Sequence, residues 1–304
     1  MCGIAGVLGS TESAGPLIAA LAHRGPNGIR IENGPDWSLG HARLSIIDLE
    51  GGWQPLHAAG STVIGNGEIY NYVELTQEFQ LKPRLATGSD FEPLLHLYAA
   101  EGAEAFTRLR GMYAFCLIGG DGRTWLARDP FGIKPLYLQG ERFASEPRAL
   151  ERGPLRVEKA QQLLALNYTL GEDTIFGGVT RLAPGEVLSL TAHPRGGGDP
   201  GLSRSHSAGN PWIPASAGKS GSLSEADALR KLDTVLEDSV RVHQRSDVPY
   251  GLFLSGGIDS TAIAALMSRI NEKPVVAFTC GFDAPGAADE RAGAERVARA
   301  LNLD

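Results

Sequence analysis

Cys2 stands at the position with the most direct chemical potential, immediately behind the initiator methionine in the start MCGIAG. A small second residue favours removal of Met1, after which the chain begins with a cysteine that carries a thiol and a free α-amine. An ordinary thiol has a pKa near ~8.5 and an α-amine a pKa near ~7.7–8.0, so the amine can take the thiol proton and activate the nucleophile. The competing interpretation is a cysteine that only packs in a buried first strand.

Three further polar positions could complete such a site. Acyl transfer from an amide requires hydrogen-bond donors for the developing oxyanion, and Asn66-Gly67 offers a side-chain amide beside a glycine N–H. Arg43 can pair with a carboxylate through two hydrogen bonds, and Asp90 can hold an ammonium group. Together they would clamp an α-amino acid, although a single Arg or Asp is usually a solvated surface charge and Asn-Gly is usually only a turn.

A glycine-rich stretch, SGGIDS at residues 255–260, is the second constellation. It lies between an apolar run and an expected helix, so its backbone N–H groups and the helix dipole would face an anion. Ser255 and Ser260 add hydroxyl donors. The stretch lacks the Gly-Lys-Ser/Thr of a Walker A loop, and two glycines after a strand can also be no more than a tight connection.

The elements that must position these residues change in character along the chain. Up to residue 190, strands and helices are interspersed without strict alternation, which indicates an α+β layered sandwich. Asp90 is expected to cap a helix over 90–109, and Asn66-Gly67 to form a turn after a strand over 61–65. Other strands are expected at 3–9, 38–48 (as a pair), 112–118, 124–128, 136–138 and 142–144, and helices at 16–21, 72–79 and 157–166.

Residues 193–222 are rich in Gly, Ser, Pro and Arg and lack periodicity, so we expect a flexible linker or an insertion there. Buried strands are expected at 249–254 and 275–279, with helices at 261–269 and 289–303, a succession typical of an α/β unit with a parallel sheet. Before them, Ser224 and Asp227 form a capping-box pattern at the start of a helix whose apolar stripe consists of Leu229, Leu232, Val235, Leu236 and Val240.

Composition bounds the class of protein. The 304 residues allow roughly two domains, and a net charge of −7 without a run of Lys or Arg argues against a nucleic-acid partner. Cys2, Cys116 and Cys280 are too few and too scattered for a disulfide framework. No run approaches the ~20 apolar residues of a membrane span, and the start lacks the pattern of a signal peptide. We therefore expect a cytoplasmic protein without a membrane partner.

A series of motifs resembles a known family in order and spacing. Beyond CGIAG, the sequence contains HRGP at 23–26, RLSI at 43–46, NGEIYN at 66–71, TGSD at 87–90 and RDPFGIKPLY at 128–137. These motifs resemble class II glutamine amidotransferases and, more closely, glutamine-hydrolysing asparagine synthetases. The resemblance implies a four-layer αββα sandwich of the N-terminal-nucleophile type over residues 2–192. The stretch over 193–222 does not follow the family pattern and looks like an insertion in the linker between two domains. Over 223–304 the resemblance implies the incomplete start of a Rossmann-like α/β ATP-pyrophosphatase domain with a parallel sheet.

By this resemblance, Cys2 attacks the side-chain amide of glutamine, forms a γ-glutamyl thioester and releases ammonia, while Asn66 and Gly67 form the oxyanion hole. The same resemblance assigns glutamine binding to Arg43, Leu44, Ser45, Ile46, Ile47, Asn66, Gly67, Glu68 and Asp90. It assigns ATP binding to Leu254, Ser255, Gly256, Gly257, Asp259, Ser260 and Cys280. Of these, Leu254 and Cys280 would line the adenine site. Cys280 also has the alternative interpretation of a small buried apolar residue.

The implied reaction activates aspartate as β-aspartyl-AMP with ATP, which enters as a substrate with Mg²⁺, and amidates it with the released ammonia. No protein-bound metal site and no prosthetic group are expected. The implied partners are glutamine, ATP and aspartate, and a homodimer is left open. A different carboxylate acceptor, and a truncated product that is only a glutaminase or inactive, stay as alternatives.

Two features depart from the family pattern. Asn27 stands where the family usually has aspartate after HRGP, and we expect this change to tune ammonia passage or domain contact without abolishing hydrolysis. The family's later pyrophosphate motif is expected beyond Asp304, so these 304 residues are expected to hydrolyse glutamine without completing a synthesis.

Overall fold

The computed structural model describes residues 1–191, 203–206, 224–281 and 289–304. The chain divides into two compact units, Met1–Ala215 and Ser216–Asp304, and each is described by itself. Most of the expected linker over 193–222 lies outside the described residues. Its residues Ser203–His206 form a strand, β12, that pairs antiparallel with β11 (Val187–Thr191).

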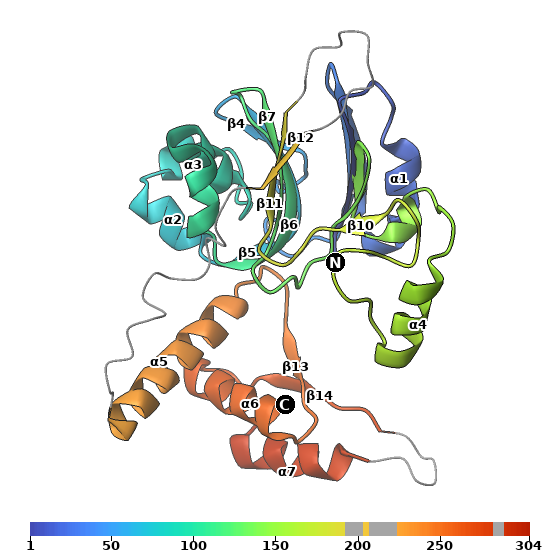
Figure 1. Ribbon diagram of the computed structural model, residues 1–304. Coiled ribbons are helices and arrows are strands. Elements are labelled where there is room, and N and C mark those ends of the chain that lie inside the picture. The colour runs from blue at the N-terminus through green and yellow to red at the C-terminus, as the bar shows by residue number, and fades with distance from the viewer. Residues whose placement is uncertain (192–202, 207–223, 282–288) are drawn as a thin grey trace. The chain divides into compact units, whose positions relative to one another are not determined.

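Two six-stranded antiparallel sheets face each other in the first unit (Figure 1). The first sheet has the order β10-β8-β9-β1-β3-β2, with the bounds Thr180–Arg181, Tyr137–Gln139, Arg142–Ala144, Gly3–Leu8, Trp37–Arg43 and Gly28–Asn33. The second has the order β12-β11-β7-β6-β5-β4, and its four remaining strands are Arg123–Arg128, Gly111–Ile118, Ser61–Ile69 and Leu56–Ala58.

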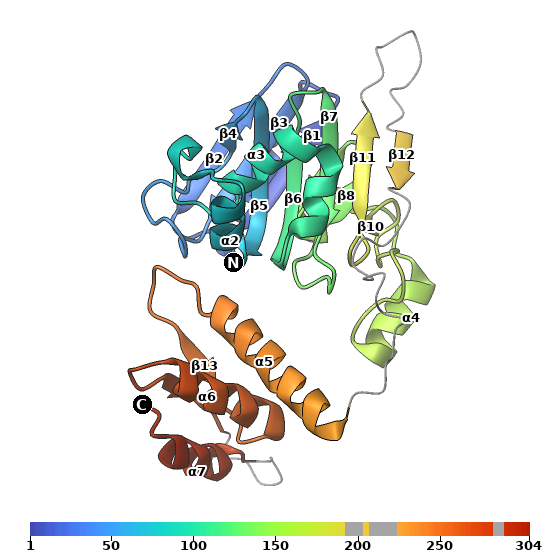
Figure 2. The ribbon, with the colours of Figure 1, turned by 90° about the vertical axis from the view of Figure 1, so that its left-hand side faces the viewer.

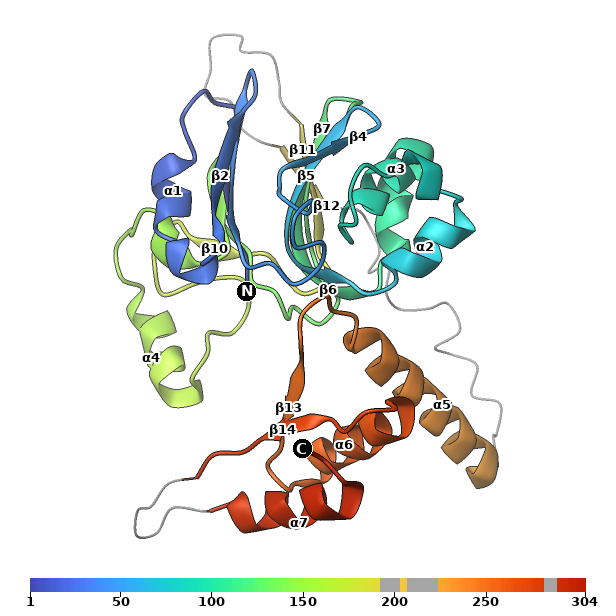
Figure 3. The same cartoon turned by 180° about the vertical axis from the view of Figure 1, so that it is seen from behind.

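Helices cover the outer faces of both sheets. Helix α1 (Gly15–Ala19) lies on the outside of the first sheet, and α4 (Val157–Leu166) lies on the same side (Figure 3). Helices α2 (Tyr72–Glu78) and α3 (Glu92–Glu101) lie over β5 and β6 of the second sheet (Figure 2). Short 3₁₀ turns occupy Ala22–Arg24, Lys82–Arg84, Gly102–Arg108 and Pro147–Ala149. The expected αββα sandwich is thereby confirmed.

Three apolar clusters hold the four layers together. The middle cluster joins side chains of the two facing sheets, such as Ile4 and Leu39 from one and Ile64 and Leu126 from the other. The other two clusters pack α1 on the first sheet, and α2 and α3 on the second. Because alternate residues of a strand point to opposite faces, one strand can supply two clusters: Ile4 and Leu8 of β1 lie in the middle cluster, and Ala5 and Val7 in the cluster with α1.

The same alternation places polar side chains at one end of the inner cluster. Cys2 shares the inward parity of Ile4, and Arg43 shares that of Leu39. On β5, Asn66 follows the inward-facing Ile64 by two residues. The sandwich therefore ends in a polar chamber lined from both sheets.

Some expectations for the first unit were wrong. The expected strand pair over 38–48 is a single strand, β3, which ends at Arg43, and β2 and β4 had not been expected. The predicted turn at Asn66-Gly67 is part of β5, which continues to Ile69. The predicted helix over 90–109 stops at Glu101, because Gly102 has a φ of +60° and the chain continues as a 3₁₀ turn.

The second unit begins with α5 (Glu225–His243), where Ser224 accepts a hydrogen bond from the N–H of Asp227 and confirms the predicted cap. Strands β13 (Gly251–Phe253) and β14 (Val276–Phe278) pair in parallel across α6 (Ile258–Ile270), and α7 (Arg291–Leu301) follows. This arrangement confirms the start of an α/β unit. None of the helices in the described ranges is both long and apolar enough to cross a membrane.

The expected burial in this unit differs from the structure. Phe253 is 84% and Phe278 55% exposed, so the two strands are not buried on both faces. The apolar stripe of α5 is likewise half-exposed at Leu229, Leu232, Val235 and Leu236. A two-stranded sheet with three helices does not offer enough surface in the described residues to cover these side chains.

Candidate active site

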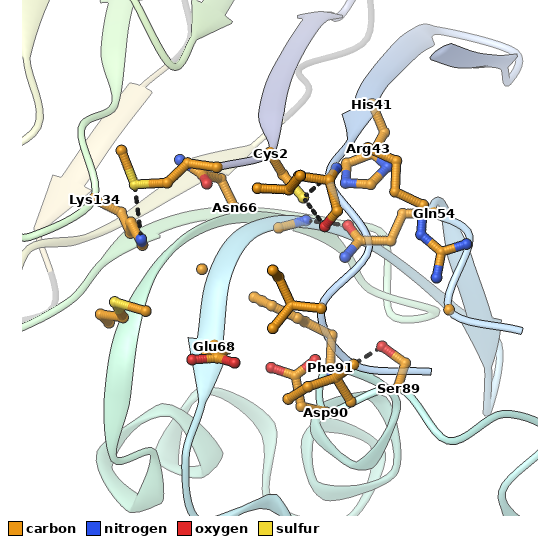
Figure 4. A pocket seen from close by; sticks show the side chains of 18 residues that line it. Cys2, His41, Arg43, Gln54, Asn66, Glu68, Ser89, Asp90, Phe91 and Lys134 are labelled. Atoms are coloured by element: carbon orange, nitrogen blue, oxygen red, sulfur yellow. Dashed lines mark hydrogen bonds between the residues drawn. The ribbon is translucent and has the colours of Figure 1, made fainter. Parts of the chain in front are cut away.

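A cavity of about 220 Å³ lies at the polar end of the sandwich (Figure 4). Its volume is below the ~300–1,000 Å³ of clefts for drug-sized ligands, so it suits a ligand of amino-acid size. Nine of the residues assigned to the glutamine site line it: Cys2, Arg43, Leu44, Ile46, Ile47, Asn66, Gly67, Glu68 and Asp90. Among the described residues, Ser45 lies outside this lining, and its N–H donates to Oδ1 of Asn27 at 3.0 Å.

The thiol of Cys2 is held beside the segment that follows β3. Its Sγ donates to the carbonyl of Leu44 at 3.4 Å and accepts from the N–H of Leu44 at 3.3 Å. Burial raises the pKa of this thiol, and the Leu44 hydrogen bond opposes that effect. With Met1 in place, the nitrogen of Cys2 is a peptide amide and cannot accept a proton. Removal of Met1 would supply the base that a raised thiol pKa requires.

Asn66 and Gly67 lie on β5, in the sheet that faces β1, the strand that Cys2 precedes. The amide of Asn66 is fully buried, and neither its Nδ2 nor its Oδ1 has a hydrogen-bond partner among the residues that the structure describes. Gly67 has a φ of +138°, and a Cβ there would lie 1.9 Å from the carbonyl oxygen of Met112, so only glycine fits. This local departure from regular strand geometry sits beside an amide with free donors, as an oxyanion hole requires.

The two terminal nitrogens of the Arg43 guanidinium have different surroundings. Its Nη2 donates to the carbonyl of Asp48, and its guanidinium carbon lies 4.8 Å from the ring centre of Trp53. Its Nη1 is buried and has no hydrogen-bond partner in the described part of the chain. An arginine held in this way keeps a charged donor for a carboxylate.

Two carboxylates lie across the cavity from Cys2 and Arg43 (Figure 4). Oδ2 of Asp90 accepts the N–H of Ile69 at 2.7 Å, yet burial raises the pKa of Asp90 to about 7. Burial also raises the pKa of Glu68 to about 6, against the opposing charge of Lys134. A positively charged group bound beside these two carboxyls would lower their pKa and favour their ionised form.

The prediction that Asp90 caps a helix was wrong. Helix α3 begins at Glu92, and no side-chain hydrogen bond caps it. The buried carboxylate of Glu92 instead accepts the N–H groups of Ala86 and Thr87 at 2.6 and 2.7 Å. The loop before α3 is thus held by Glu92, which leaves Asp90 to face the cavity.

Several lining residues had not been predicted: Met1, His41, Gly52, Gln54, Gly65, Ser89, Phe91, Met112 and Lys134. His41 lies two residues before Arg43, so strand parity alone could have placed it on the same face. Burial, together with Arg43 and Arg30, lowers the pKa of His41 to about 3, so its ring is neutral. Nζ of Lys134 donates to the sulfur of Met1 at 3.0 Å, and no local sequence pattern predicts this contact.

The SGGIDS stretch of the second unit comprises a tight loop after β13, at residues 255–257, and the first three residues of α6. Its two serine hydroxyls lie 3.0 Å apart, and Ser260 Oγ accepts the N–H of Ser255 at 3.3 Å. Gly256 has a φ of +76°, and a Cβ there would lie 2.7 Å from the backbone nitrogen of Ala294. Gly257 is the N-cap of α6 without a side-chain cap, so the helix N-terminus faces the loop.

The remaining residues assigned to ATP are Leu254 and Cys280, which follow β13 and β14, and Asp259 in α6. Leu254 is buried, and its N–H donates to the carbonyl of Phe278 at 2.8 Å. Asp259 lies in the first turn of α6. Cys280 is exposed, so its interpretation as a buried apolar residue was wrong. In the described part of the chain, no group of three or more His, Cys, Asp or Glu side chains could hold a metal ion.

Comparison with known proteins agrees with this geometry. The family model described as glutamine amidotransferase domain matches residues 1–196, and the one described as asparagine synthase matches residues 231–304. The chain therefore belongs to the glutamine amidotransferase domain family, with an asparagine synthase segment after it.

Curated relatives carry both segments. Asparagine synthetase [glutamine-hydrolyzing] 1 of Bacillus subtilis is 34% identical over 100% of this chain and 49% of its own length. Asparagine synthetase B [glutamine-hydrolyzing] of Escherichia coli K12 is 33% identical over 83% of this chain and 41% of its own. The chain thus spans about half the length of the curated relatives it matches.

Among solved structures, glutamine phosphoribosylpyrophosphate amidotransferase of B. subtilis, complexed with ADP and GMP, matches with a TM-score of 0.46 and 22% identity. The match covers 67% of this chain and 49% of that one.

Proposed function

We propose that the first unit hydrolyses glutamine to glutamate and ammonia, with Cys2 as the nucleophile. The observation that carries this proposal is the meeting, in one cavity of about 220 Å³, of a thiol, an unpaired buried amide and the charged groups Arg43 and Asp90. Each group matches one part of glutamine: the thiol and the amide of Asn66 match the side-chain amide, Arg43 the α-carboxylate and Asp90 the α-ammonium.

The proposed steps follow from these positions. After Met1 is removed, the α-amine of Cys2 takes the thiol proton, and Sγ attacks the side-chain carbonyl carbon of glutamine. The side-chain Nδ2 of Asn66 and the N–H of Gly67 stabilise the oxyanion. The C–N bond breaks, the α-ammonium of Cys2 returns its proton to the departing nitrogen, and ammonia leaves behind a γ-glutamyl thioester. Water then attacks the thioester, which releases glutamate and restores the thiol.

We propose further that the second unit supports the use of this ammonia. The SGGIDS loop would hold the phosphates of ATP, which enters with Mg²⁺, and the activated carboxylate would be that of aspartate. The loop geometry at the N-terminus of α6 and the names of the relatives support this step. The domain limits 2–192 and 223–304, the cytoplasmic location and a homodimer stay predictions.

The test is glutamate release by the purified chain, with intact mass reporting whether Met1 has been removed. We expect turnover by the processed chain and its loss, by at least ~10³-fold, in Cys2→Ala, because the covalent step is then removed. Asp36→Asn, an exposed carboxylate outside the cavity, is the control and should match the wild type. A processed chain that releases no glutamate, or a Cys2→Ala chain that still does, would refute the proposal.

A further inference from the structure

Asp48 joins two segments that form opposite sides of the cavity. It lies in the segment after β3, with a φ of +50°, and its carboxylate uses both oxygens. Oδ1 accepts the N–H of Gly51 at 2.9 Å, within its own segment. Oδ2 accepts the N–H of Gly88 at 2.8 Å, which belongs to the loop before α3. The second bond spans forty residues of sequence and reaches within two residues of Asp90.

The main chain of the same residue holds Arg43. The carbonyl oxygen of Asp48 accepts from Nη2 of Arg43, and it also accepts the N–H of Gly52 at 3.0 Å. A Cβ at Gly51 would lie 2.6 Å from Oδ2 of Asp48, so the turn closes tightly around the carboxylate. The carbonyl that orients Arg43 is therefore fixed by the carboxylate of its own residue.

These contacts connect the two charged anchors of the cavity. Arg43 ends a strand of one sheet, whereas Asp90 precedes the helix that covers the other sheet. The α-carboxylate and α-ammonium of an amino acid are attached to one carbon, so their two partners must be held at one separation. Without a tie, that separation would vary with the packing of the two sheets and with the loop before α3.

We infer that Asp48 is a positioning residue for the substrate: it sets the placement of Arg43 relative to Asp90 and thereby the affinity for a zwitterionic α-amino acid. This inference rests on the proposed function. It concerns the binding of the two charged ends and leaves the chemistry at Cys2 unchanged.

Asp48→Asn tests the inference because it replaces only one carboxylate oxygen, by an NH₂ group. The amide keeps one oxygen acceptor but turns an NH₂ group toward one of the two glycine N–H donors, so one of the two ties is lost. We expect KM for glutamine to rise about tenfold, equivalent to ~1.4 kcal/mol of binding free energy, while kcat stays within about threefold. Asp48→Ala should raise KM further, because it removes both ties.

A second substrate separates positioning from a general loss of structure. Glutaramate keeps the amide and the carboxylate of glutamine but lacks the α-ammonium, so it uses one anchor only. Its inhibition constant against glutamine hydrolysis should change less than about threefold in Asp48→Asn. Equal weakening of both compounds, or a fall in kcat at unchanged KM, would overturn the inference.

Asp121→Asn is the matched control, because Asp121 also accepts a backbone N–H, that of Arg123 at 3.1 Å, in a turn outside the cavity. Its KM should equal that of the wild type. Asp48→Glu keeps both oxygens on a longer side chain, and an intermediate KM there supports the inference if Asp48→Asn does not fold. A wild-type chain without turnover refutes the proposed function, whereas turnover with unchanged KM in the Asp48 variants refutes this inference alone.

Discussion

The buried carboxyl of Asp90 should lower the free energy of unfolding of the protein at neutral pH and above. Burial raises the pKa of this carboxyl from 3.8 to about 7. The unfolded chain releases this proton near pH ~3.9, so between about pH 4 and 7 the folded state binds more protons than the unfolded state. Stability contributed at Asp90 therefore falls as pH rises through this window and is constant above it. At ~1.36 kcal/mol per pKa unit, the change amounts to roughly 4 kcal/mol as an upper limit.

Asp90→Asn keeps the shape of the side chain and an oxygen for the N–H of Ile69, but it carries no titrating proton. We expect this variant to be more stable than the wild type by up to ~4 kcal/mol at pH 8 and by up to ~2 kcal/mol at pH 5. Glutamine hydrolysis should be lost at both pH values, because the partner of the α-ammonium is gone. Urea unfolding followed by tryptophan fluorescence, fitted to the transition of the first unit, measures the free energy of unfolding.

The control is Asp36→Asn, whose exposed side chain should change stability by no more than ~0.5 kcal/mol. A gain in Asp90→Asn that is equal at pH 5 and pH 8 would show that it does not arise from the proton equilibrium. A variant less stable than the wild type at pH 8 would show that the ionised carboxylate is well solvated or paired, and the electrostatic reasoning would fail.

Three further predictions follow from the same geometry. kcat/KM for glutamine should fall about tenfold per pH unit below about pH 7, since Asp90 takes up a proton there; a profile that is flat down to pH 6 would contradict this. A chain with lysine inserted between Met1 and Cys2 should retain Met1, as intact mass can verify, and lose at least ~10²-fold in glutamate release; full activity would show that a free α-amine on Cys2 is not needed. Gly256→Ala should destabilise the second unit by ~1–3 kcal/mol in a calorimetric scan, because its φ is +76° and the new Cβ would lie 2.7 Å from the nitrogen of Ala294. Glutamate release should persist in that variant, and a second unit that melts unchanged would contradict the close approach.

Local patterns predicted much of the fold. The helix over 157–166 and the strands expected at 112–118 and 124–128 appear within a residue of their expected bounds, and these two strands pair as β6 and β7 around a glycine-rich turn. The prediction for Asn66-Gly67 failed because Asn-Gly is a strong turn signal, whereas pairing with Tyr113 and its neighbours on β6 keeps Gly67 inside a strand. Tertiary pairing overrode a local preference there.

The candidate site divides in the same way. Cys2, Arg43 and Asn66 could be predicted from residue type and from motif resemblance, and strand parity shows why all three point into the space between the two sheets. Lys134 reaches the cavity from the loop before β8, a position that depends on how the chain crosses between the sheets. Asp48 could not be recognised from sequence either, because an aspartate that accepts two backbone N–H groups looks the same as a surface aspartate until Gly88 is placed beside it.

The cavity contains several buried polar groups of a kind that folded proteins usually avoid. Within the described ranges, the amide of Asn66 and one nitrogen of Arg43 are buried without hydrogen-bond partners, and burial raises the pKa of Asp90. Under the proposed function, an α-amino acid with an amide side chain would supply a partner for each: a carboxylate for Arg43, an ammonium for Asp90 and a carbonyl oxygen for Asn66. The free energy that these groups cost in folding would then return as affinity for the substrate and as stabilisation of the oxyanion. A cavity built for structure alone would have no reason to keep all three, because apolar side chains of the same volume would fill it at lower cost.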